Sequence, residues 1–284
     1  MSPEKLTWIT GAGGLIGHHL AQTASLYAPQ RDVVALTRTQ LDLADFPAVR
    51  REFRRQRPGL VIHCAALSRS PACDADPALA RKVNVEITAL LAELAAEIPF
   101  VFFSSDLVFD GAAGNYDEQA PVNPLSVYAE TKVAAEQVVL RNLRHTVVRT
   151  SLNSGPSPTG DRAVDEQVRK AWQGGKTLRL FTDEFRCPIP AAVTARTVWE
   201  LMGQNRPGVY HIAGRERLSR WEIGQILAAS WPELTPRMQP ASLTEAVGSR
   251  RPPDTSLNCA KVQALLSFPL PRWSEWIGGR GREI

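Results

Sequence analysis

The stretch Leu6-Thr7-Trp8-Ile9-Thr10-Gly11-Ala12-Gly13-Gly14-Leu15-Ile16-Gly17 decides the fold of this 284-residue chain. An apolar run gives way to glycines and then resumes in a helical pattern, which predicts a strand, a tight turn and a helix. Such a turn places a helix N-terminus, with its free N–H groups and positive dipole end, against a pyrophosphate. Gly11 permits the turn, Gly14 lets the backbone approach the phosphates, and Gly17 lets the helix pack closely on the strand. The first helical residues, Leu15 and Ile16, then offer their N–H groups to the ligand.

The spacing of these glycines, G-x-x-G-x-x-G, differs from the common dinucleotide fingerprint G-x-G-x-x-G. An ordinary strand-to-helix turn is therefore the alternative interpretation. The position of the motif favours dinucleotide binding, because strand-like and helix-like runs alternate in the chain that follows.

That alternation predicts an α/β fold with a Rossmann-type doubly wound parallel sheet. The expected strands are 6–10, 32–37, 60–63, 100–103 and 145–149, and the strand at 32–37 is expected to be buried. Beyond the first helix, the expected helices are 46–57, 77–96 and 126–140. After Thr150 the elements become shorter and are interrupted by proline. We therefore expect a cofactor-binding domain over 1–150 and a mainly substrate-binding lobe over 151–284, with a strand near 208–212 returning to the sheet.

Composition excludes several classes of protein. With 44% hydrophobic and 22% charged residues the chain has the composition of an ordinary globular protein, and no apolar run has the length of a membrane span. The first five residues lead directly into the first strand, so we expect no signal peptide. The net charge of +4 is modest, and the arginine-rich run 50–57 is interpreted as a solvated helix face rather than a nucleic-acid patch.

The four cysteines are Cys64, Cys73, Cys187 and Cys259, and they form no C-x-x-C pair. This spacing indicates neither a zinc site nor a disulfide framework, so we expect no metal and a cytoplasmic location. The oligomeric state is not determined by the sequence, and a homodimer is one option.

Cofactor preference is predicted from the end of the second strand. In the dinucleotide fold an acid near this place binds the ribose hydroxyls of NAD, whereas an arginine accommodates the 2′-phosphate of NADP. No acid occupies 36–40, and Arg38 stands there instead, so NADP(H) is preferred and NAD(H) is the alternative. Arg38 as an ordinary surface residue is the other interpretation. Small residues at the end of the third strand, Ala65 and Ala66, leave room for a ligand, and the preceding His63 is expected to be an interior histidine.

Three polar residues follow the fourth strand in an order that suits carbonyl reduction. Ser105 lies at the carboxyl end of that strand, and Tyr128 and Lys132 share one face of the next helix because they are four residues apart. Each of them alone has a structural explanation, as a turn former or as a chance pair on a helix. Their occurrence together, after a glycine turn, favours catalysis.

With these residues in place, the chain resembles the extended short-chain dehydrogenase/reductases, and within them the dTDP-4-dehydrorhamnose reductase group, to which a regulatory subunit of methionine adenosyltransferase also belongs. The likeness covers nearly the whole chain. Its matching stretches are TGAGGLIG (10–17), LDLAD (41–45), VIHCAAL (61–67), VNVEIT (83–88), SSDLVFDG (104–111), VYAETKVAAEQ (127–137), VVRTS (147–151), GVYHIAG (208–214) and RRPPDTSLNCAKVQALL (250–266).

The chemistry that these residues suit is hydride transfer to a carbonyl. Negative charge develops on the carbonyl oxygen, and Tyr128 is the expected proton donor, with the ammonium of Lys132 lowering the pKa of its phenol. The resemblance implies that Lys132 also holds the nicotinamide ribose and that Ser105 orients the carbonyl. It further implies cofactor contacts from Asn84, Asp42 and Leu43. The alternatives are a backbone-bonding asparagine inside a helix and a turn-forming acid.

The substrate half departs from the family. Leu152 follows Arg-Thr-Ser where the family usually carries an aromatic, and Leu107 stands where tyrosine is common. Asp106 and Arg186 are expected substrate contacts, the latter to a phosphate or carboxylate unless it is only a surface arginine. We predict an NADPH-dependent reductase of a keto group on a nucleotide sugar or related carbonyl compound. The alternatives are an epimerase or dehydratase of the same superfamily and a cofactor-binding regulatory subunit.

Overall fold

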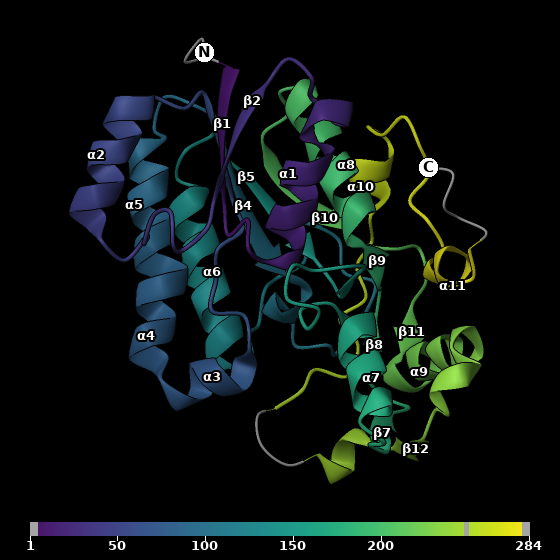
Figure 1. The fold of residues 1–284 in the computed structure, drawn as a ribbon. Coiled ribbons are helices and arrows are strands. Elements are labelled where there is room, and N and C mark those ends of the chain that lie inside the picture. Colours follow the sequence, from purple (N-terminus) through teal and green to yellow (C-terminus); the bar gives the residue numbers. More distant parts are fainter. Residues whose placement is uncertain (1–4, 247–249, 280–284) are drawn as a thin grey trace.

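A six-stranded sheet forms the centre of the computed structural model, which describes residues 5–246 and 250–279 (Figure 1). All neighbouring strands in it are parallel. In spatial order the strands are β10 (Gly208–Ile212), β5 (Thr146–Thr150), β4 (Phe100–Ser105), β3 (Leu60–His63), β1 (Leu6–Thr10) and β2 (Asp32–Leu36). The order of strands reverses beside β1, and in this architecture a ligand crevice opens at that point, at the carboxyl ends of the strands.

Helices cover both faces of the sheet (Figure 1). On one face α1 (Leu15–Tyr27) packs along α8 (Ala191–Gly203), and both contribute to one apolar core. On the other face α2 (Phe46–Gln56), α5 (Ile87–Leu94) and α6 (Val127–Val139) enclose a second core. The predicted α/β fold with a doubly wound parallel sheet is confirmed.

The chain after Thr150 contributes to two parts of the molecule. Strand β10, α8 and α10 (Ala260–Gln263) pack with the elements of the first half. Most of the remaining elements form a lobe beside the carboxyl ends of the strands (Figure 1). These later elements are β6 (Asn153–Ser154), α7 (Val164–Gln173), β7 (Leu178–Phe181), β8 (Phe185–Arg186), β9 (Ile189–Pro190), β11 (Leu218–Ser219), α9 (Arg220–Ser230), β12 (Met238–Ala241) and α11 (Trp273–Ile277).

Two elements differ from the sequence-based expectation. Strand β2 is only half-buried, because it is the edge strand of the sheet and has a neighbour on one side only. The single helix expected over 77–96 is divided into α4 (Pro77–Arg81), a π-helical turn (Lys82–Glu86) and α5. Such turns insert one extra residue per turn and re-aim the side chains that they carry. A further short helix, α3 (Ser70–Ala75), precedes α4.

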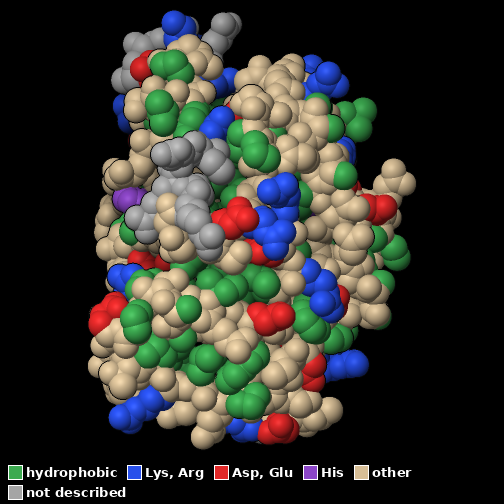
Figure 2. Space-filling model, turned by 90° about the vertical axis from the view of Figure 1, so that its right-hand side faces the viewer, with side chains coloured by type: hydrophobic (Ala, Val, Ile, Leu, Met, Phe, Trp, Pro, Cys, Tyr) green, Lys and Arg blue, Asp and Glu red, His purple; other side chains and the backbone are tan. Residues whose placement is uncertain are grey.

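In the described residues no helix combines the length and the apolar character needed to cross a bilayer. Figure 2 views the molecule from the side on which α9 and α11 lie. Apolar side chains form several separate groups on this face, and positive side chains lie among negative ones.

Candidate active site

The glycine turn has the backbone that its sequence predicts. Gly11 has a φ of +69°, and a Cβ there would lie 2.6 Å from the backbone nitrogen of Ala65. A Cβ on Gly17 would lie 2.5 Å from the carbonyl oxygen of Gly11. Both positions therefore require glycine. Helix α1 begins directly after Gly14 with no side-chain cap, so its first N–H groups are left for a ligand, which fits a dinucleotide pyrophosphate.

A cavity of about 1140 Å³ runs from this turn along the carboxyl ends of the strands. A dinucleotide together with a second small molecule needs a volume of this order. The cavity brings together most residues predicted from the sequence, which are Gly11, Gly14, Leu15, Ile16, Gly17, Arg38, Asp42, Leu43, Ala65, Ala66, Ser105, Asp106, Leu107, Tyr128, Lys132, Leu152 and Arg186.

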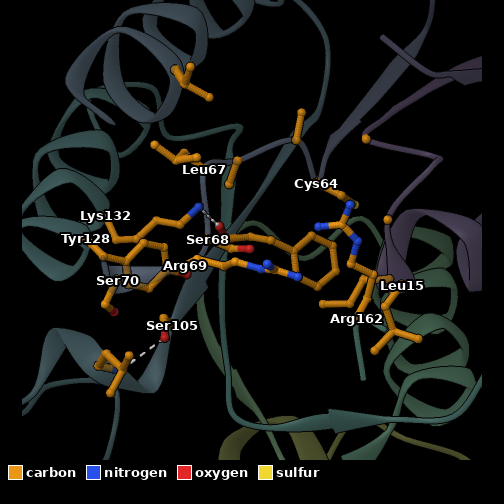
Figure 3. Close-up of a pocket in the computed structure, with 18 of the residues that line it drawn as sticks. Leu15, Cys64, Leu67, Ser68, Arg69, Ser70, Ser105, Tyr128, Lys132 and Arg162 are labelled. Carbon is orange, nitrogen blue, oxygen red and sulfur yellow. Dashed lines mark hydrogen bonds between the residues drawn. The ribbon is translucent and has the colours of Figure 1, made fainter. Parts of the chain in front are cut away.

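The catalytic candidates lie in the middle of this cavity (Figure 3). Ser126 caps α6 by accepting a hydrogen bond from the N–H of Ala129 at 3.3 Å, and the helix begins at the next residue, Val127. The helix then presents Tyr128 and Lys132 on one face, and both side chains are buried. Figure 3 shows Ser105 across from Tyr128, at the end of β4.

Burial is the main cause of the pKa shifts of Tyr128 and Lys132. It raises the pKa of Tyr128 above the usual value, and the hydrogen bond with Ser105 opposes the rise only in part. Burial also lowers the pKa of Lys132 to about 8. In this structure, burial therefore outweighs any lowering of the tyrosine pKa by Lys132. The ammonium donates to the carbonyl of Phe103 at 2.9 Å and lies 5.9 Å from the Tyr128 ring centroid. Tyr128 is consequently a neutral phenol, which is the form that donates a proton.

Asp106 is a buried carboxylate whose oxygens bond to other residues of the protein. It accepts hydrogen bonds from Ser105 at 3.1 Å, from Ser151 at 2.7 Å and from Thr255 at 3.1 Å. The Nε atom of Arg186 lies 3.7 Å from it. This arrangement connects the end of β4 to the lobe and orients the hydroxyl of Ser105. Asp106 also lines the cavity, and its direct contact with a substrate stays a prediction.

Arg186 is likewise buried, with a side chain only 3% exposed. Its guanidinium donates to the carbonyls of Phe185 at 2.8 Å and Pro252 at 3.3 Å, and its Nη2 lies 3.1 Å from Glu184. Although Arg186 lines the cavity, its N–H groups are engaged inside the protein, because a buried guanidinium must be paired.

Among the other arginines that line the cavity, Arg220 and Arg251 share the carboxylate of Glu184 with Arg186, and local sequence patterns do not single them out. Glu184 is fully buried and accepts hydrogen bonds from Arg220 at 2.9 Å and from Arg251 at 2.6 and 3.0 Å. Burial alone would raise the pKa of Glu184, but the charges of Arg220, Arg251 and Arg186 lower it to about 2. One carboxylate therefore orients several guanidinium groups at this end of the cavity. The pair Arg250-Arg251 is the one signal that the sequence offers, and it lies within a longer family motif.

The opposite end of the cavity carries the residues expected around the adenosine. Arg38 is 88% exposed, and its Nε lies 4.0 Å from Asp42. Asp42 also accepts a hydrogen bond from the N–H of Ala44 at 3.0 Å, so it forms a turn as well as lining the cavity. Leu43 lies beside it.

Asn84 is the one predicted site residue that does not line the cavity as described. It lies on the π-helical turn and is fully buried. Its amide donates to the carbonyl of Leu67 and to Thr131, both at 3.0 Å, and its oxygen accepts from the N–H of Leu67 at 2.8 Å. These bonds hold the loop after β3, and a direct contact of Asn84 with the cofactor stays a prediction. His63 is the expected interior histidine, bonded to Thr10 at 2.7 Å and Thr88 at 3.1 Å.

The fold and the site together define an NAD(P)-dependent oxidoreductase of the extended short-chain dehydrogenase/reductase class. The parallel sheet, the glycine turn and the Ser-Tyr-Lys group in one cavity are the features of that class. The chain belongs to the family described as RmlD substrate binding domain, whose model matches residues 5–279.

Similar proteins include a dTDP-4-dehydrorhamnose reductase from Sinorhizobium fredii, 28% identical over 282 residues, with 94% of this chain and 93% of that protein covered. The methionine adenosyltransferase 2 subunit beta of Rattus norvegicus is 26% identical over 277 residues, covering 93% and 83%. The crystal structure of the dTDP-4-dehydrorhamnose reductase of Bacillus anthracis in complex with NADP superposes with a TM-score of 0.88 at 22% identity, covering 99% of both chains. That structural likeness shows a shared fold.

Proposed function

We propose that this protein is an NADPH-dependent reductase of a keto group on a nucleotide sugar. The observation that carries the proposal is the placement of Ser105, Tyr128 and Lys132 in one cavity, between an uncapped helix N-terminus and a pair of oriented arginines. A purely regulatory subunit has no need of a buried proton donor at this position. The reductase is therefore the better supported function.

Each residue has a defined task in this reaction. The reduced nicotinamide supplies the hydride when it is bound. Tyr128 donates its phenolic proton to the developing alkoxide, and Ser105 orients the carbonyl oxygen by turning its hydroxyl from Asp106 to donate to that oxygen. Lys132 is charged below about pH 8 and stabilises the phenolate that remains. Its family role of holding the nicotinamide ribose is included in the proposal.

The arginines of the lobe favour a phosphate-bearing substrate. Arg220 uses its Nε to bind Glu184, and Arg251 uses Nε and Nη2, so each retains N–H groups toward the cavity. With Arg186 included, three guanidinium groups are paired with two carboxylates, those of Glu184 and Asp106. A nucleoside diphosphate would satisfy the remaining positive charge. These arginines all follow Thr150, which supports the assignment of the later elements to substrate binding.

Two departures from the family concern the sugar or base of the substrate. Leu107 and Leu152 both line the cavity, where the family tends to have aromatic rings. A stacked ring contributes about 1–3 kcal/mol per base in nucleic-acid complexes, which corresponds to roughly ten- to hundred-fold in affinity. We therefore expect dTDP-4-dehydro-L-rhamnose to be a poor substrate, with kcat/KM below about 10⁴ M⁻¹s⁻¹.

The test is a steady-state assay of NADPH oxidation with this compound and with a panel of other nucleotide ketosugars. Leu152→Trp should raise kcat/KM for the rhamnose precursor by about tenfold. Leu143→Trp is the matched control, because Leu143 is 89% exposed and lies outside the cavity. If the wild type reduces the rhamnose precursor with kcat/KM of about 10⁴ M⁻¹s⁻¹ or above, Leu107 and Leu152 do not determine the substrate specificity. If no ketosugar in the panel is reduced, the proposed substrate class is wrong.

We expect Arg38 to give the protein its preference for NADPH over NADH. Residues 36–40 contain no acid, and the guanidinium of Arg38 is exposed at the cavity, with Asp42 4.0 Å from its Nε, where it can approach a 2′-phosphate. NADPH should bind at least about tenfold more tightly than NADH, as one charge-assisted contact would give. Arg38→Asp should remove or reverse that difference, whereas Arg141→Asp, an exposed change outside the cavity, should not. Fluorescence titration measures both affinities, and equal affinities in the wild type would refute this assignment.

The four cysteines Cys64, Cys73, Cys187 and Cys259 are free thiols. Within the described residues no group of His, Cys, Asp or Glu is arranged to hold a metal ion. Free thiols are typical of a reducing compartment, and we place the protein in the cytoplasm on that ground.

A further inference from the structure

Segment 155–163, here called the strap, contacts α1 near both of its ends, and its residues Asp161 and Arg162 line the cavity. The carbonyl oxygen of Pro156 lies 3.0 Å from Nε2 of His19 on α1. At the other end of the strap Ala163 packs against Leu15, the first residue of α1. In between, Asp161 lies 3.5 Å from Nη2 of Arg69, on the loop after β3. The strap thus contacts both sides of the groove.

Two carboxylates at the start of α7 hold the strap. Asp165 accepts a hydrogen bond from the N–H of Gly155 at 3.0 Å. Glu166 accepts from the N–H groups of Ser157 at 2.6 Å, Arg162 at 3.0 Å and Ala163 at 3.1 Å. Because its backbone is bonded in this way, the position of Arg162 is set by the fold.

Arg162 and Arg69 bring two positive charges to the cavity. Figure 3 shows them between Tyr128 and Lys132 on one side and Leu15 on the other. A single carboxylate, Asp161, serves both, at 3.3 Å from Arg162 and 3.5 Å from Arg69. Arg162 uses its Nε for Asp161 and for Thr159, and its Nη groups make no hydrogen bond within the part of the chain that the structure describes. The pair therefore carries a net positive charge directed at the groove.

We propose that Arg162, assisted by Arg69, binds the pyrophosphate of the dinucleotide from the side opposite the N-terminus of α1. Ala163, the residue after Arg162, packs on Leu15, and Figure 3 shows the Arg162 side chain beside Leu15, where the first N–H groups of α1 lie. A pyrophosphate has two negative charges, which are met by the net positive charge of the two guanidinium groups with their shared carboxylate together with the positive dipole end of α1. The strap then encloses the cofactor between two cationic surfaces. This inference rests on the cofactor of the proposed function and adds residues from outside the glycine turn.

Arg162→Gln should weaken NADPH and NADH equally, by about tenfold, because both cofactors share the pyrophosphate. This equal loss separates Arg162 from Arg38, whose change affects NADPH alone. Arg162→Lys, which keeps the charge, should retain most of the affinity, and Arg69→Gln should show a smaller loss. The matched control is Arg144→Gln, since Arg144 makes an exposed ion pair with Glu97 at 2.6 Å away from the cavity. Titration by cofactor fluorescence measures each value, and thermal unfolding of each variant checks the fold.

Affinities of Arg162→Gln within twofold of the wild type would overturn the inference, as would a loss confined to NADPH. If the wild type binds neither cofactor, the proposed function fails together with this inference. If the wild type binds the cofactors and Arg162→Gln binds them equally well, only the proposed contact between the strap and the pyrophosphate is refuted.

Discussion

Tyr128→Phe should abolish most turnover while leaving NADPH affinity nearly unchanged. The substitution removes only the phenolic O–H, which is the proton donor to the reduced carbonyl. General-acid catalysis of this kind contributes about 10²–10⁴-fold, so kcat should fall by that factor. Burial keeps the phenol neutral, and Phe is therefore a close structural replacement for its reactive form. Steady-state kinetics on an accepted ketosugar and fluorescence titration with NADPH measure the two effects.

The control for this variant is Tyr116→Phe. Tyr116 is also buried, and its hydroxyl donates to Asp110 at 2.8 Å outside the cavity. That change should cost stability through a lost hydrogen bond, by about 1 kcal/mol, but little activity. Retention of most activity in Tyr128→Phe would assign the proton donor to another group.

Lys132→Met should damage both turnover and cofactor binding. The lost ammonium no longer stabilises the phenolate, and the loss of its proposed bond to the ribose should weaken NADPH by about tenfold. A pH profile gives a second, independent readout. Since burial lowers the pKa of Lys132 to about 8, the group is charged below this pH and neutral above it. Wild-type kcat/KM should therefore fall by about tenfold per pH unit above that value, and the variant should lose this limb.

Lys261→Met is the matched control for this prediction. Lys261 also donates to a backbone carbonyl, that of Val209 at 2.7 Å, and its ammonium lies 4.5 Å from the ring centroid of Tyr210. These contacts resemble those of Lys132 with Phe103 and Phe102, at 2.9 and 4.6 Å, but they lie outside the cavity. Its replacement should leave the pH profile unchanged. An alkaline limb that persists in Lys132→Met would mean that another group titrates.

The sequence by itself determined the fold class and pointed to the proposed catalytic group, because both are signalled by patterns between near neighbours in the chain. The positive φ of Gly11 and the contact of Gly17 with the Gly11 carbonyl are local features, and a spacing of four places Tyr128 and Lys132 on one helix face. Parallel strands end at one edge of the sheet, so the end of the fourth strand is enough to place Ser105 at the same edge as the other ligand-binding loops. The half-buried edge position of β2 could not be predicted in the same way, since strand order is a property of the whole sheet.

Only the tertiary structure decided how the charged residues of the cavity are paired. Glu184 lies 36 residues from Arg220 and 67 from Arg251, and no local pattern joins them. The predicted phosphate contact Arg186 is buried against Asp106, whereas Arg220 and Arg251 retain N–H groups that face the cavity. The cost of burying a charge depends on what the fold packs around it, and a linear sequence does not contain that environment. The pKa of Tyr128 depends on its environment in the same way: burial raises it, although the sequence places Lys132 one helical turn away.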